Sequence, residues 1–101
     1  QCVLFRSSPM IKSFTCPDTQ DLFAGKTVPR FVNIRSVAER KLQMIHRATG
    51  INDLRIPPNN RLEALKGDRK GQYSIRINDQ WRICFTFDNG QAFDVSIVDY
   101  H

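Results

Sequence analysis

Residues 73–97, YSIRINDQWRICFTFDNGQAFDVSI, decide the fold. Within this stretch, apolar and polar side chains alternate over three runs, which is the period of a β-strand with one buried face. The three runs are residues 73–77, 81–87 and 93–97. Asn78-Asp79 makes a turn after the first run, and Asp88-Asn89-Gly90 is a strong hairpin signal after the second. The stretch therefore predicts an antiparallel meander.

The sequence before the meander carries a helical period. Apolar side chains three and four positions apart predict a helix over residues 34–48, capped by Asn33 or Ser36 and followed by Gly50. The other expected elements are a strand at 11–15, a helix at 18–23, a loop at 26–33 and a strand at 61–65. Because residues 24–33 show little apolar patterning, we expect that loop to be mobile. The predicted fold class is α+β, with two N-terminal helices packed on one face of a mainly antiparallel sheet of four to five strands.

The length of 101 residues leaves room for one domain. We expect residues 10–101 to form it, because Met10 is followed at once by a strand-like segment, and residues 1–9 to be an upstream extension or an expression remnant. That opening has neither the basic start nor the long apolar segment of a secretory signal. No apolar run approaches the length of a membrane span, so we expect neither a transmembrane protein nor a membrane partner.

The charge is unevenly distributed along the chain. Fifteen Lys and Arg against ten Asp and Glu give a net charge of +5, which points weakly towards a polyanionic partner. Residues 55–82 hold seven basic side chains against three acidic ones, whereas residues 83–101 hold three Asp and no Lys or Arg. A solvated charged face is the plain interpretation of such a segment. The basic middle of the chain is nevertheless where a phosphate site is to be sought.

Strand alternation takes two arginines out of the core. The side chains on either side of Arg82 must face the helices, so Arg82 points to the opposite face, and the same alternation applies to Arg76. We expect this face to be uncovered and to lie beside the basic turn of residues 66–71, where guanidinium groups can bind phosphate oxygens. Pairing with strand neighbours such as Asp94 is the alternative, and spacing alone favours neither.

The chain ends with a carboxylate, a phenol and an imidazole, carried by Asp99, Tyr100 and His101. A last strand would place them beside the basic face, and histidine is the side chain best matched to proton transfer near neutral pH. Cations beside an acid/base pair could cleave RNA, since the 2′-hydroxyl needs a base, the phosphorane needs positive charge and the leaving 5′-oxygen needs an acid. The alternative is a frayed C-terminus without a function.

The sequence predicts no metal site. Its three cysteines, Cys2, Cys16 and Cys84, and its two histidines are widely spaced, whereas a structural zinc site needs four clustered ligands. Free thiols in a reducing cytoplasm are the simplest interpretation, with Cys84 buried in a strand. We therefore expect neither a metal nor a cofactor.

Four motifs are distinctive when taken together. They are MIKSF at residues 10–14, SVAERKL at 36–42, LKGDRKGQYSIRINDQWRICF at 65–85 and the terminal VDYH at 98–101. This combination resembles the HigB-type toxins of the RelE/ParE superfamily, especially the GraT branch, and the resemblance covers residues 10–101. It implies a RelE/ParE-like fold and a cytoplasmic toxin that cleaves mRNA on the ribosome, with an antitoxin that neutralises it.

The resemblance also implies roles for individual residues. The RNA- and phosphate-contacting cations of the family fall on Lys66, Arg69 and Arg82. The C-terminal catalytic segment of the family falls on Asp99, Tyr100 and His101. Arg76 joins the cations by strand alternation. Some relatives carry a histidine shortly before the LKG motif, where this chain has Glu63 and Arg61, and this departure leaves the two terminal residues as the main acid/base candidates.

The leading hypothesis is a type II toxin that cleaves mRNA in the ribosomal A site, on the 30S side, without a metal. The four cations would hold the phosphate, and one of Tyr100 and His101 would act as base and the other as acid, with Asp99 orienting them. Its expected partner is a HigA-type helix-turn-helix antitoxin, which alone would contact operator DNA. The first alternative is a ParE-like inhibitor of DNA gyrase without enzymatic activity. The second is a basic nucleic-acid-binding module, which predicts salt-sensitive binding without cleavage.

Overall fold

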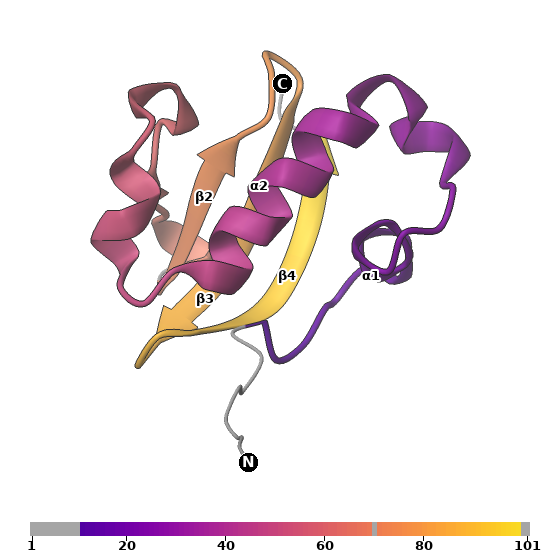
Figure 1. The fold of residues 1–101 in the computed structure, drawn as a ribbon. Coiled ribbons are helices and arrows are strands. Elements are labelled where there is room, and N and C mark those ends of the chain that lie inside the picture. The colour runs from indigo at the N-terminus through magenta and orange to yellow at the C-terminus, as the bar shows by residue number, and fades with distance from the viewer. Residues whose placement is uncertain (1–10, 70, 100–101) are drawn as a thin grey trace.

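The predicted meander is present in the computed structural model, which describes residues 11–69, without the side chain of Arg69, and residues 71–99. Its three antiparallel strands are β2 (Gln72–Arg76), β3 (Trp81–Asp88) and β4 (Gln91–Asp99). A two-residue strand, β1 (Glu63–Ala64), pairs with β2 and confirms the centre of the strand expected at 61–65. Within the described residues the sheet has the order β1-β2-β3-β4 (Figure 1).

Two helices accompany this sheet, which confirms the α+β class. The longer helix, α2 (Arg35–Arg47), crosses one face of the sheet, and α1 (Pro17–Phe23) lies beside β4 (Figure 1). The two helices also contact each other. Thr19 joins α1 to the sheet, because its Oγ1 accepts a hydrogen bond of 2.9 Å from the backbone N–H of Ile97. The helices therefore occupy one face of the sheet and its β4 edge.

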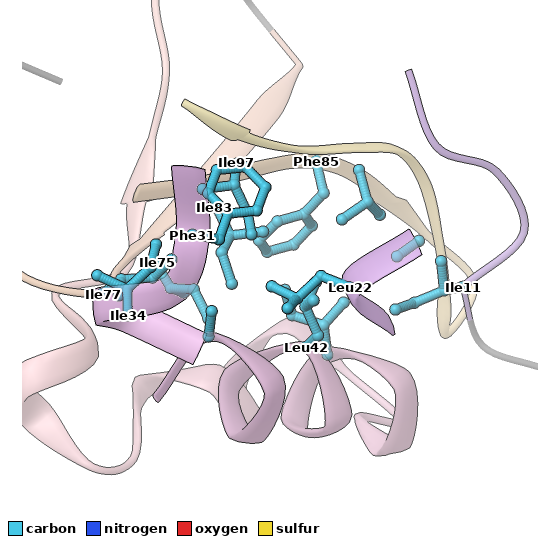
Figure 2. Close-up of a cluster of buried hydrophobic side chains, with 14 of the residues drawn as sticks. Ile11, Leu22, Phe31, Ile34, Leu42, Ile75, Ile77, Ile83, Phe85 and Ile97 are labelled. Carbon is cyan, nitrogen blue, oxygen red and sulfur yellow. The ribbon is translucent and has the colours of Figure 1, made fainter. Parts of the chain in front are cut away.

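The core lies between α2 and the sheet, as the sequence predicts. Leu42 and Ile45 on α2 are fully buried, and so are Ile75, Ile83 and Phe85 on the strands that face this helix. Figure 2 shows Leu42 and the three strand residues in this cluster. These strand residues are the alternate positions that the meander assigns to the helix side. The apolar periods of helix and strand thus meet in one core, and the opposite face of β2 and β3 carries the polar side chains.

The ends of α2 differ from the prediction. Asn33 and Ser36 do not cap the helix, because a 3-10 helix, η2 (Pro29–Ile34), leads directly into it and Ile34 takes the N-cap position without a side-chain hydrogen bond. Gly50 has a φ of −152°, so it is not the left-handed residue expected after the helix. At this end Thr49 donates hydrogen bonds to Asp53 Oδ2 from its backbone nitrogen and its hydroxyl, at 3.0 and 3.1 Å.

The loop expected at 26–33 is wrong for its second half, which forms η2. Val28, Phe31 and Ile34 are buried, and the ring of Phe31 meets Trp81 edge-on with centroids 5.5 Å apart. A single apolar residue per turn was enough to anchor the segment, because each faces the core from a tight 3-10 turn. The reason for expecting mobility of residues 24–33, little apolar patterning, therefore does not hold from residue 28 onwards.

The strand expected at 11–15 is also wrong as a regular strand. This segment runs parallel to β4 but forms only two isolated bridges, Ile11 to Ala92 and Phe14 to Val95. Between these bridges Asp94 has a φ of +57°, which interrupts the extended backbone of β4, and its N–H donates to Ser13 Oγ at 2.9 Å. A continuous ladder cannot form across that break.

Three short 3-10 helices complete the described chain. They are η3 (Ile51–Arg55), η4 (Pro58–Asn60) and η5 (Gly67–Arg69). No helix in the described part of the chain combines the length and the apolar character needed to cross a lipid bilayer. The expectation for residues 1–9 lies outside the described residues.

Candidate functional site

The site begins with two arginines that face each other across neighbouring strands. In the register of β2 and β3, Arg76 stands directly opposite Arg82, with Ser74 opposite Cys84 next to them. Like charges in directly opposite positions of a sheet destabilise it. A facing arginine pair is therefore expected where an anion is to be bound, since an anion between two guanidinium groups turns the repulsion into attraction.

Arg82 points away from the helices, as predicted, but it is not on an uncovered face. Its Nε donates to Ser74 Oγ at 2.9 Å, and its Nη2 donates to the carbonyl oxygens of Arg61 and Ser74 at 2.7 and 3.4 Å. Arg82 is only 8% exposed, and Ser74 and Cys84 on the same face are buried. The expectation of an open face is therefore wrong at this point, because the chain around Arg61 lies against the guanidinium group.

Glu63 is the acidic partner of Arg82. Its Oε1 lies 3.1 Å from Arg82 Nη2, and the side chain of Glu63 is 56% exposed, against 10% for that of Arg82. The strand pairing explains the contact, because Glu63 of β1 stands opposite Ser74 of β2. The alternative partner considered from the sequence, Asp94, instead contacts Ser13 at the β4 edge of the sheet, which is the edge opposite β1.

A buried polar pair holds the chain that presents the Arg61 carbonyl. Asn60 is fully buried, accepts a hydrogen bond from Lys41 Nζ on α2 and donates one of 3.1 Å to the carbonyl of Leu54. The next residue, Arg61, has left-handed backbone angles, φ 47° and ψ 56°. Such angles are uncommon for a residue other than glycine and persist where surrounding contacts impose them. We connect them to the hydrogen bond that the Arg61 carbonyl accepts from Arg82.

Lys41 is a buried cation that the sequence analysis did not single out. Burial lowers the pKa of its amine, and the neighbouring charges of Arg40 and then Arg76 lower it further. The apolar stripe of α2 conceals this residue, because a lysine among apolar positions is usually interpreted as snorkelling to the surface. Lys41 thus lies within the electrostatic influence of Arg76, one of the two arginines of the site.

Arg76 is held less tightly than Arg82. Its side chain is 30% exposed and forms an ion pair with Asp79, whose side chain is 99% exposed. Arg76 is the last residue of β2, and Asp79 lies in the turn between β2 and β3. Asn78 closes this turn by accepting hydrogen bonds of 2.8 Å from the N–H groups of Gln80 and Trp81. Arg76 thus has one solvent-facing partner.

The basic turn after β1 lies at the other end of β2. The N–H of Leu65 donates to Gln72 O at 2.8 Å and closes this turn, in which Lys66 is exposed and Arg69 ends η5. Because β2 has five residues, the turn lies about 13 Å along the strand from Arg76, at about 3.3 Å per residue. The expectation that the arginine pair lies beside the turn is therefore wrong for Arg76, whereas the side chain of Arg82 reaches back to Ser74.

Asp99 lies at the end of β4, on the face of the sheet away from Arg82, so the expectation that it lies beside the basic face is wrong. It stands opposite Trp81, whose ring packs on Phe31 in the core, whereas Val98 stands opposite Arg82. Its Oδ2 accepts a hydrogen bond of 3.2 Å from Gln80 Nε2 in the β2–β3 turn. The predicted catalytic residues Tyr100 and His101 lie outside the described residues.

The side chains of the described residues form no cluster of the kind that binds a metal ion. Among them, no group of three or more His, Cys, Asp or Glu is arranged to hold a metal ion. Cys16 is a free thiol, and Cys84 is buried in β3 as predicted. The third cysteine, Cys2, lies outside the described residues. The described side chains of the site offer guanidinium, carboxylate and hydroxyl groups.

Comparisons with known proteins agree on one group. Residues 23–101 match the model of a family described as "RelE-like toxin of type II toxin-antitoxin system HigB". Toxin HigB-1 of Vibrio cholerae is 44% identical over 69 residues, covering 68% of this chain and 72% of that protein. Endoribonuclease HigB of Proteus vulgaris is 41% identical over 98 residues, covering 91% of this chain and 100% of that protein.

A solved structure shares the fold. A chain of the YoeB-YefM complex from Staphylococcus aureus superposes with a TM-score of 0.56 at 22% identity, covering 90% of this chain and 97% of that one. At this identity the likeness concerns the arrangement of helices and sheet alone.

Proposed function

Since this chain belongs to the HigB family of RelE-like toxins of type II toxin–antitoxin systems, we propose that it is an endoribonuclease that cuts mRNA in the ribosomal A site. Endoribonuclease activity is supported by the Proteus vulgaris relative, which carries that name and aligns over its whole length. The single structural observation that supports the proposal best is the facing pair of Arg76 and Arg82.

In the proposed site the arginine pair holds the scissile phosphate. A phosphodiester carries one negative charge, and the pentacoordinate transition state of cleavage carries more. Arg82 is fixed by Ser74 and by the Arg61 carbonyl, so it needs little reorganisation to stabilise the added charge. Arg76, with one exposed partner, can close on the phosphate from the opposite strand. No metal is needed in this scheme, because the two guanidinium groups supply the positive charge.

Proton transfer is assigned to Tyr100 and His101, on the resemblance of the VDYH terminus to the family. One of the two accepts the proton of the 2′-hydroxyl as its oxygen bonds to phosphorus, and the other gives a proton to the 5′-oxygen as the bond from phosphorus to that oxygen breaks. The products are a 2′,3′-cyclic phosphate and a 5′-hydroxyl. The hydrogen bond from Gln80 to Asp99 supports a role for Asp99 in orienting the end of β4, next to which both groups follow in the sequence.

Lys66 and Arg69 are proposed to contact the RNA beyond the scissile phosphate. Their turn lies about 13 Å along β2 from Arg76, at about 3.3 Å per residue, which is a span of more than one nucleotide along an extended strand. The exposure of Lys66 supports such a contact. These cations would hold the backbone without reading its sequence.

An antitoxin is the partner that membership of a toxin–antitoxin family implies. We propose that it is a HigA-type helix-turn-helix protein that alone contacts operator DNA, and that the toxin works in the cytoplasm on the 30S side of the ribosome. A chain of this size cannot enclose an RNA strand, which supports a substrate presented by a larger partner.

Induction of the toxin in growing cells tests the proposal. Primer extension on abundant messages should show new 5′ ends within coding regions soon after induction. Intact messages combined with DNA gyrase inhibition would instead support the ParE-like alternative, and salt-sensitive RNA binding without new ends would support a binding module. Cleavage that is lost with EDTA while the ribosomes stay intact would contradict the metal-free scheme.

A further inference from the structure

We propose that Glu63 occupies, in the free protein, the place on Arg82 that the substrate phosphate takes, and that phosphate binding displaces the carboxylate. The inference deepens the proposed function and depends on it for the identity of the ligand. It makes the ion pair between Glu63 and Arg82 a built-in competitor of the substrate. The observation behind it is an exposed carboxylate placed on a buried, facing arginine.

The contacts of Arg82 differ in how easily they can be exchanged. Ser74 is buried and belongs to the middle of β2, and the Arg61 carbonyl is fixed by the backbone of its turn. Glu63 approaches from the two-residue edge strand β1 with a side chain that is 56% exposed. A carboxylate in this position can return to water without leaving a buried polar group unpaired. Glu63 is therefore the exchangeable partner.

The hydrogen-bonding capacity of Arg82 points the same way. Nη2 has two hydrogens; it donates hydrogen bonds to the carbonyl oxygens of Arg61 and Ser74, and it lies 3.1 Å from the carboxylate of Glu63 in an ion pair. The two carbonyl contacts satisfy the group when the carboxylate leaves. A phosphate that arrives on the same side can then take over the position of the carboxylate without breaking the contacts that orient the guanidinium group.

A phosphate between the strands gains an interaction that Glu63 does not make. Glu63 is paired with Arg82, whereas Arg76 is paired with Asp79 in the β2–β3 turn. When Arg76 leaves the exposed Asp79, it can turn towards an anion that has replaced Glu63 on Arg82, and two cations on one phosphate outweigh one cation on an exposed carboxylate. In the free protein, Glu63 offsets the charge of the pair and thereby limits binding to RNA that is not correctly placed.

The test measures RNA binding apart from cleavage. The probe is a short single-stranded RNA with a 2′-O-methyl group at every nucleotide, which removes the attacking hydroxyl, labelled for fluorescence anisotropy at about 0.15 M salt, where only nearby charges act. We expect Glu63→Gln to bind this RNA about three- to fivefold tighter than the wild type, the range that corresponds to loss of an exposed ion pair. Binding that is unchanged or weaker would overturn the proposal.

Glu39→Gln is the matched control. It makes the same chemical change and the same change in net charge, and it also releases an arginine, because Glu39 pairs with Arg35 at 3.6 Å on α2, the helix across the other face of the sheet. Its gain in RNA affinity should be clearly smaller than that of Glu63→Gln. Equal gains in RNA affinity for the two variants would mean that the gain comes from the change in net charge alone, and this would contradict displacement at Arg82.

A double-mutant cycle separates the displacement from the proposed function. In an Arg82→Gln background, shown to be folded by circular dichroism, Glu63→Gln should no longer tighten RNA binding, and a persistent gain would refute the proposal. Ribosome-dependent cleavage by the wild type is measured in parallel. If cleavage is absent while the cycle gives the expected coupling, the proposed function is wrong and the displacement stands. If cleavage is present while the coupling is absent, the proposed function stands and the displacement is wrong.

Discussion

Arg76 and Arg82 stand opposite each other, but the β1 side of the sheet and the β2–β3 turn hold them in different ways. On the β1 side, Arg82 is buried, donates hydrogen bonds to a serine hydroxyl and two backbone carbonyls, and forms an ion pair with a carboxylate. Next to the turn, at the end of β2, Arg76 is partly exposed, and its partner Asp79 in the turn is almost fully exposed. The same side chain is thus fixed in one region and adjustable in the other.

The difference assigns separate tasks to the two arginines. A guanidinium group that is already oriented stabilises developing charge without reorganisation, which is the larger effect in phosphoryl chemistry. A guanidinium group with one exposed partner contributes attraction but loses side-chain entropy when it binds. We therefore expect Arg82 to carry the larger share of catalysis and Arg76 to contribute mainly to holding the phosphate.

Loss of Arg82 should have the largest effect. Arg82→Ala should slow ribosome-dependent cleavage by about 100-fold or more, the usual result of removing one oriented donor to a developing charge. Quantified primer extension on a defined message measures this rate. Arg82→Lys keeps the charge but loses the planar fork that meets Ser74 and Arg61, so it should restore only part of the activity. A rate within threefold of wild type for Arg82→Ala would break the comparison.

The next largest effect is expected from removing the side chain of Asn60, which holds the chain next to Arg61. Asn60→Ala leaves the Lys41 ammonium and the Leu54 carbonyl without their buried partner, so the free energy of unfolding should fall by about 2–3 kcal/mol. Urea denaturation measures the change. Asn59→Ala, at the exposed neighbouring position, should change it by less than about 0.5 kcal/mol. Equal effects at the two positions would show that the buried pair does not hold this turn.

Removal of Arg76 should cost less than removal of Arg82. We expect Arg76→Ala to slow cleavage by about tenfold, equivalent to about 1.4 kcal/mol. The folded state should lose less than about 1 kcal/mol, since the pair with Asp79 is largely exposed. Asp79→Asn, which leaves the arginine in place, should leave cleavage nearly unchanged. If Arg76→Ala is as damaging as Arg82→Ala, the two arginines do not divide their tasks as described.

The smallest expected effect is on the pKa of Lys41. Burial and the charges of Arg40 and Arg76 lower this pKa in the folded protein, so the protein loses stability as the pH falls from the pKa of the unfolded chain through the lower folded pKa. Arg76→Gln removes one of these charges and should raise the folded pKa, which NMR titration of the lysine Cε resonance measures. Arg40→Gln should raise it more, because Arg40 has the larger influence. An unchanged pKa of Lys41 in the Arg76→Gln variant would show that Arg76 does not influence Lys41.

Much of the fold follows from local pattern. The alternation and turn signals of residues 73–97 correctly predict three strands and their core face, and the stripe on residues 34–48 correctly predicts α2. The failures depend on contacts between distant segments. The left-handed Asp94 breaks the ladder to residues 11–15, and η2 is anchored by the packing of Phe31 on Trp81. Neither the backbone angle of Asp94 nor the contact between Phe31 and Trp81 can be recognised from the neighbouring sequence.

The sequence predicts which face of the sheet Arg82 occupies, but not which groups its guanidinium contacts. Strand alternation places Arg82 on the correct face, because a period of two needs no tertiary information. Its partners could not be predicted, since Glu63 reaches it only through the register of β1 with β2, and the Arg61 carbonyl only through a left-handed turn supported from α2.

Cleavage of one mRNA in vitro, with and without ribosomes and with analysis of the new ends, tests the central claim most directly. The wild-type protein should cut only when ribosomes are present and should leave a 2′,3′-cyclic phosphate and a 5′-hydroxyl, while Arg82→Ala leaves the message intact. Cuts made equally well without ribosomes, ends that carry a 5′-phosphate, or full cleavage by Arg82→Ala would contradict the account.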